Sequence, residues 1–312
     1  VKDLGGKAKN QESKDFVRSA IKARYGPDLT NQDLTTKYLP NLYKALGMMP
    51  LEHTKKNPML REINRKRTEK SYEGDYKAGK INLNVPKTGA QDSWLSFKQA
   101  LTDRSELGGI ATSQFDIYVL HEVGHAVDDN QKFMAGKVGN VRYGGWQKHE
   151  IGAVARMVGQ EKGFFKDFQL PKAFLEAYLT AMLDKKDASS VASTAGAPPP
   201  NDPLWGKLEK HEAVAHCIAI RVDGKLWEKG NSGAAKYALG GSVYQEAYAG
   251  DWVSYALSAR SAKVSDYQFR AEGEWYAEAY AAFFVNKLSD SHPLHAELKA
   301  AQDKEKKTKK KK

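Results

Sequence analysis

The segment His121 to His125, which reads His-Glu-Val-Gly-His, constrains this chain more than any other feature. Histidines four positions apart lie on one face of an α-helix, so both imidazoles can point at one metal ion with the Glu122 carboxylate beside them. Gly124 has no side chain, so a neighbouring backbone or the metal can come close. The spacing therefore predicts a metal-binding helix with two ligands and a base.

The flanking residues favour that helix. Apolar side chains fill most positions from Phe115 to Val127, and Ser113 offers an N-cap with Asp116 three residues later. We predict a buried helix from about 114 to 129. The alternative is that both histidines are ordinary core residues satisfied by hydrogen bonds.

A catalytic zinc ion takes three protein ligands and leaves a fourth position for water, whereas a structural zinc is closed by four protein ligands. The next histidine after His125 is His149, too far along the chain for the short spacing of a three-histidine site. A carboxylate is therefore the better candidate for the third ligand.

Residues 272–284 form an apolar, aromatic segment interrupted by carboxylates. We predict a second buried helix here, in which Glu274 and Glu278 share a face. Buried charges of one sign need a cation or hydrogen-bond donors, which suits one as a zinc ligand and the other as an acceptor that orients a ligand histidine. The alternative is an amphipathic helix with a solvated glutamate stripe.

Residues 121–129, Tyr267 and residues 274–280 together resemble the catalytic domain of the anthrax-lethal-factor-like gluzincin peptidases. The resemblance covers about 30 residues in two blocks. It implies zinc as cofactor and the following roles: His121, His125 and Glu274 as metal ligands, Glu122 as general base, Glu278 as the carboxylate beside a ligand histidine, and Tyr267 as the donor to the oxyanion.

The fold expected from the resemblance is α+β, a predominantly helical zincin-like metallopeptidase with a small sheet. Residues 126 to 273, 148 in number, separate the two blocks, which is more than the family usually has. We thus expect these regions: a helical N-terminal part (1–70), a catalytic domain (71–296) with a large insertion (about 135–250) that includes a Pro/Ala/Ser-rich linker (187–203), and a disordered lysine-rich tail (297–312).

The segment Lys80 to Val85 alternates and precedes Pro86, which predicts a short strand. In a zinc peptidase, such a strand can be the sheet edge on which an extended substrate pairs, or it can be an ordinary core strand. Residues 172–183 are predicted to be helical.

Two groups of residues compete for these roles. His211 and His216 are spaced five apart, which puts them on different faces of a helix. Tyr255 rivals Tyr267 for the oxyanion role, although core packing explains it better. His149 has no partner at the right spacing, and His53, His292 and His295 lie among polar residues without a helix pattern that suggests a site.

The composition of the chain restricts the kinds of protein to which it can belong. A single cysteine, Cys217, excludes an intramolecular disulfide, no apolar run is long enough to span a membrane, and no signal peptide opens the chain. Because the first residue is Val1, we expect a part of a longer protein. Residues 299–312 supply eight lysines against two acids, hence six of the eleven net positive charges, and without aromatic interleaving they predict no specific nucleic-acid partner.

These observations predict a zinc-dependent peptidase, more specifically an endopeptidase, whose partner is a protein or peptide substrate. The resemblance further implies a secreted or delivered bacterial toxin or effector, and with it an inhibitor or immunity protein as a further partner. Two alternatives stay open: a zinc amidase acting on cell-wall peptides, and a non-catalytic binding module with a structural zinc.

Overall fold

The computed structural model describes residues 11–29, 38–68, 74–86, 114–248 and 250–310. They form two compact units, the first made of the N-terminal part up to residue 136 together with residues 272–312, and the second of residues 137–271. Helices predominate and two small sheets accompany them, so the chain belongs to the α+β class.

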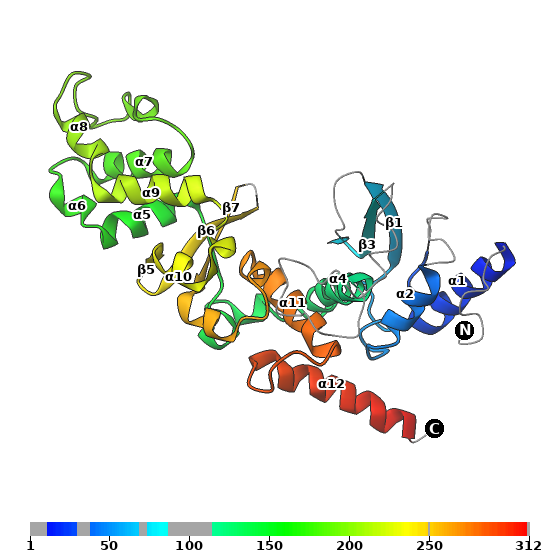
Figure 1. The fold of residues 1–312 in the computed structure, drawn as a ribbon. Helices are drawn as coiled ribbons and strands as arrows, with labels where there is room; N and C mark the ends of the chain where they lie inside the picture. Colours follow the sequence, from blue (N-terminus) through cyan, green and yellow to red (C-terminus); the bar gives the residue numbers. More distant parts are fainter. Residues whose placement is uncertain (1–10, 30–37, 69–73, 87–113, 249, 311–312) are drawn as a thin grey trace. The chain divides into compact units, whose positions relative to one another are not determined.

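The first unit holds the HExxH helix. Its helices are α1 (Gln11–Tyr25), α2 (Leu39–Leu46), α4 (Gln114–Gln131), α11 (Glu272–Phe284) and α12 (Pro293–Lys310). The predicted helices over 114–129 and 272–284 are confirmed as α4 and α11, which lie side by side (Figure 1). Ser113, the expected N-cap, lies outside the described residues.

Helices α4 and α11 pack closely because small residues face each other. A Cβ added to Gly124 of α4 would lie 3.1 Å from the Cα of Ala277 and 3.2 Å from the Cβ of Tyr280, both in α11. The missing side chain of Gly124 therefore allows the backbone of α11 to come close to α4. From Glu274 to Phe284 every residue of α11 is buried, which rules out the solvated glutamate stripe.

A three-stranded sheet stands beside α4 in the same unit, with the order β1 (Glu62–Thr68), β3 (Lys80–Pro86) and β2 (Gly74–Lys77). β1 is parallel to β3, and β2 is antiparallel to it. The predicted strand is thus confirmed as β3, and it is the central strand of this sheet, so of the two alternatives the core strand is correct and the substrate-pairing edge is wrong. The edge strand that contacts α4 is β2.

The ends of the first unit differ from expectation. The N-terminal 70 residues were expected to be helical, yet they include β1 at residues 62–68. The lysine-rich tail was expected to be disordered from residue 297, yet α12 continues to Lys310. Buried Leu294 and Leu298 anchor the start of this helix. Further along α12, the Glu305 carboxylate accepts a hydrogen bond from the Leu51 N–H at 2.5 Å.

The second unit combines helices with an antiparallel sheet of order β4-β7-β6-β5. Its strands are β4 (Gln147–His149), β5 (Ala238–Leu239), β6 (Ser242–Tyr248) and β7 (Asp251–Ala256), and its α-helices are α5 (Ile151–Glu161), α6 (Phe164–Asp167), α7 (Lys172–Leu183), α8 (Leu204–Glu209), α9 (Glu212–Asp223) and α10 (Gly230–Ala235). The predicted helix over 172–183 is confirmed as α7. Short 3-10 turns join these elements, and one of them, Ala188–Val191, lies in the expected linker with Val191 buried.

No helix among the described residues combines the length and the apolar character needed to cross a membrane.

Candidate metal centre

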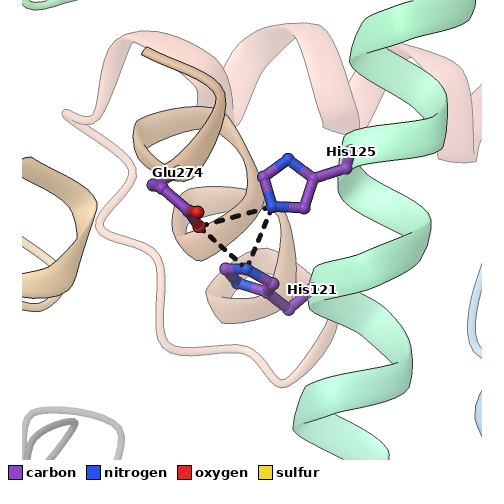
Figure 2. Close-up of side chains that lie close together, drawn as sticks. All are labelled: His121, His125 and Glu274. Carbon is purple, nitrogen blue, oxygen red and sulfur yellow. Dashed lines mark hydrogen bonds and ion pairs between the residues drawn. The ribbon is translucent and has the colours of Figure 1, made fainter. Parts of the chain in front are cut away.

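Three side chains from α4 and α11 converge on one point. Figure 2 shows His121 and His125, one turn apart on α4, facing Glu274 of α11. The two Nε2 atoms are 3.2 Å apart, and Oε2 of Glu274 lies 3.1 Å from Nε2 of His121 and 3.3 Å from Nε2 of His125. The three atoms form a nearly equilateral triangle.

The edge length of this triangle fits zinc. Nitrogen and oxygen ligands lie about 2.0–2.1 Å from Zn²⁺, so tetrahedral angles separate neighbouring ligand atoms by about 3.3 Å. The three observed separations are within 0.2 Å of that value. The donor set, two imidazoles and one carboxylate, is also one that zinc accepts, and among the described residues the group has three members, as a catalytic site requires.

The Glu274 carboxylate is buried, with 5% of its residue surface exposed. Burial alone would raise the pKa of this group, but the two histidines beside it hold the pKa well below its usual value. The carboxylate is therefore kept as an anion inside the protein, next to two nitrogens that can be metal ligands. A cation at the centre of the triangle would neutralise this buried negative charge.

Glu278, one turn after Glu274, lies behind the first histidine. Its Oε1 is 2.8 Å from Nδ1 of His121, on the ring side opposite the triangle, and the residue is 1% exposed. A carboxylate in this position favours the tautomer with the proton on Nδ1, which leaves the Nε2 lone pair of His121 free to bind a metal.

Glu122 follows His121 on α4 and is buried, and its carboxylate lies against β2. A Cβ added to Gly74 would stand 2.5 Å from Oε1 of Glu122, so only glycine fits there without a shift. The edge strand therefore passes directly over the residue that the HExxH spacing assigns as the base.

The sequence analysis missed Tyr76, which also comes from β2. Its ring lies nearly parallel to that of His125, at an interplanar angle of 11° and with 6.4 Å between centroids. Its hydroxyl donates to Oδ2 of Asp129 at 2.8 Å. The available signal was the tight turn at Ala78 and Gly79, which pairs residues 74–77 with 80–83 in a hairpin.

Tyr267 belongs to the second unit. There its hydroxyl accepts a hydrogen bond from Nη1 of Arg270 at 3.3 Å, and its ring meets Trp227 edge-on. Its role as oxyanion donor stays a prediction. Tyr255 is fully buried in the same unit and accepts a hydrogen bond from Arg260 at 2.7 Å, which is the core packing expected for it.

Two of the other histidines, His211 and His149, have structural partners. His211 caps the start of α9 through the Ala213 N–H, and its Nε2 lies 3.1 Å from Asp167. His149 bonds to Ser254 at 2.8 Å between strands β4 and β7. Among the described residues, neither belongs to a second group able to hold a metal ion.

No protein-family model, no curated protein and no solved structure matches this chain.

Proposed function

We propose that this protein is a zinc-dependent peptidase, and that His121, His125 and Glu274 hold the metal. The observation that carries the proposal is the triangle of ligand atoms, whose edges of 3.1–3.3 Å fit zinc and whose third corner comes from a distant helix. The zincin-like fold and the kinship with gluzincins are part of the same proposal, supported by the order HExxH then glutamate along the chain.

When bound, zinc would polarise the scissile carbonyl and make the attacking water more acidic. The residues of the chain carry the proton. Glu122 accepts a proton from the water as its oxygen bonds to the carbonyl carbon, and then delivers that proton to the amide nitrogen as the carbon–nitrogen bond breaks. Glu278 keeps His121 in the metal-binding tautomer throughout.

An extended peptide would bind along β2. Lys77 and Lys80 flank the two-residue turn, so they form a hydrogen-bonded pair. Because the two kinds of pair alternate along an antiparallel ladder, Tyr76–Ile81 and Gly74–Leu83 are non-hydrogen-bonded pairs. The main-chain groups of Gly74 and Tyr76 therefore point away from β3, toward an edge that pairs with no strand among the described residues. A substrate strand there would pass next to Glu122.

Two further parts of the proposal rest on the resemblance alone: that Tyr267 donates a hydrogen bond to the oxyanion, and that the protein is a secreted or delivered bacterial toxin or effector, whose partners are a protein substrate and an inhibitor or immunity protein. A zinc amidase could use the same residues on cell-wall peptides. A structural zinc in a binding module would need a fourth protein ligand.

The test combines metal analysis with an unbiased digest. We expect one zinc per chain, cleavage of a peptide library or casein, and no release of peptides from peptidoglycan. Glu122→Gln should bind zinc as the wild type does and lose turnover, whereas His121→Ala should lose both. Full activity in Glu122→Gln, or a chain that binds no zinc, would refute the proposal, and cleavage of peptidoglycan alone would favour the amidase.

A further inference from the structure

Tyr76 connects the edge strand to the metal helix at the second histidine. Its ring lies flat beside the ring of His125, and its hydroxyl reaches Asp129, which is one turn further along α4. Asp129 also holds Lys132 at 2.6 Å. Tyr76 therefore contacts α4 at His125 and again one turn later, at Asp129.

The two ligand histidines are held by different means. His121 is buried, and Glu278 stands behind its Nδ1 at 2.8 Å. The His125 side chain is more open, at 19% exposure, and the ring of Tyr76 lies nearly parallel to its ring, with 6.4 Å between centroids. Offset parallel contacts between aromatic rings are favourable, so the Tyr76 ring favours one orientation of the imidazole.

The orientation of this ring decides whether Nε2 points into the triangle. A ligand must be held within about 0.5 Å and 10–20° of its productive geometry for the site to keep its affinity. Rotation of the His125 ring out of its plane would move Nε2 away from Glu274, which now lies 3.3 Å from it.

We propose that Tyr76 is a positioning residue that fixes the ring of His125 for metal binding, with its hydroxyl tethered by Asp129. The inference rests on the proposed function. The same tether holds β2, and thus Gly74, against the Glu122 carboxylate.

Two substitutions separate the ring from the hydroxyl. Tyr76→Phe keeps the ring and removes the tether, whereas Tyr76→Leu removes both. The matched controls are the same substitutions at Tyr237, whose hydroxyl also donates to an aspartate, Asp223. That aspartate pairs with Lys229, and the Tyr237 ring also lies beside a histidine, His216, at 6.3 Å between centroids.

The measurements are the zinc affinity by chelator competition, the visible absorption of the cobalt-loaded protein and the dissociation rate of cobalt. Outer partners of metal ligands are worth about 10- to 100-fold in affinity. We expect Tyr76→Leu to lose zinc affinity about 10-fold and to change the cobalt bands. Tyr76→Phe should retain the cobalt bands, because it keeps the aromatic ring, and should release cobalt about 2- to 5-fold faster than the wild type, because it lacks the hydroxyl. Both Tyr237 variants should match the wild type.

The outcomes distinguish this inference from the function on which it rests. A wild-type protein that binds no zinc or cobalt would refute the proposed function. A wild type that binds metal, with Tyr76→Leu identical to it, would refute only the role of Tyr76. If Tyr76→Leu does not fold, Tyr76→Phe decides, because a cobalt release rate equal to that of Tyr237→Phe contradicts the tether.

Discussion

The Glu122 carboxylate lies against the main chain of Gly74, so that a Cβ on Gly74 would stand 2.5 Å from its Oε1 and 2.7 Å from its Cγ. Glu122 is only 3% exposed and cannot swing into solvent to make room. The edge strand and the metal helix can approach this closely because the strand has no side chain at that point. Any residue larger than glycine would push the carboxylate or the strand aside.

Gly74→Ala is therefore expected to lower kcat while zinc stays bound. A displacement of a catalytic group by about 1 Å costs up to about 100-fold in rate, so we expect a loss of roughly 10- to 100-fold. Steady-state kinetics and metal analysis of the same preparation measure both quantities. Gly136→Ala is the matched control, because a Cβ there meets nothing within 4 Å. Equal rates in the two variants would show that Glu122 tolerates the methyl group.

Removal of the Glu278 carboxylate is expected to weaken the metal site. Glu278→Ala removes the carboxylate oxygen that lies 2.8 Å from Nδ1 of buried His121, and we expect the zinc affinity, measured by chelator competition, to fall by about 10- to 100-fold. Glu278→Gln keeps an oxygen that can accept and should lose less. Glu297→Ala, an exposed glutamate of α12, provides the control. A Glu278→Ala protein with wild-type affinity would contradict the orienting role.

Helices α4 and α11 could be predicted from the sequence because their evidence is local. The histidine spacing and the apolar flanks defined α4, and the aromatic run around two glutamates defined α11. The position of Tyr76 beside His125 could not be predicted, since it depends on a hairpin whose first strand has only four residues and on the way that strand packs on α4. Likewise, alternation identified β3 as a strand but carries no information on its neighbours, so its central place remained unknown.

The burial of His53 predicts a dependence of stability on pH. Burial lowers the pKa of His53 to about 4, and its Nδ1 shares a hydrogen bond with the Tyr280 hydroxyl at 2.9 Å behind the metal helices. Between about pH 6.5 and 4 the unfolded chain binds a proton at this histidine that the folded protein does not, so folding is disfavoured as the pH falls through that range. From pH 7.5 to 5 this costs about 2 kcal/mol.

Urea unfolding of the metal-free protein at those two pH values tests this expectation. His53→Gln keeps an amide that can bond to Tyr280 and removes the titrating group. Between pH 7.5 and 5 the free energy of unfolding of this variant should therefore fall by about 2 kcal/mol less than that of the wild type. The other histidines are common to both proteins and cancel in the difference. Parallel losses in wild type and variant would assign the acid sensitivity to other groups.

The end of α12 offers a test of whether the lysine-rich segment supports the metal centre. Glu305 accepts from the Leu51 N–H, and Lys304 lies 3.1 Å from Glu52, so the helix holds the turn at residues 51–57. That turn in turn supports the metal helices, since Asn57 donates to the Ala126 carbonyl at 3.1 Å and His53 bonds to Tyr280. Truncation after Gln302 removes both α12 contacts, whereas truncation after Lys307 removes only lysines and a threonine.

Truncation after Gln302 is expected to lower the free energy of unfolding by about 1–3 kcal/mol. Most of this loss comes from the hydrogen bond of Glu305 to a main-chain donor, because exposed ion pairs such as Lys304–Glu52 contribute little. Truncation after Lys307 should leave stability unchanged, although it removes four of the positive charges. Thermal unfolding of the two truncated proteins distinguishes these cases. Equal midpoints would mean that the helix beyond residue 302 contributes nothing to the unit that holds His121, His125 and Glu274.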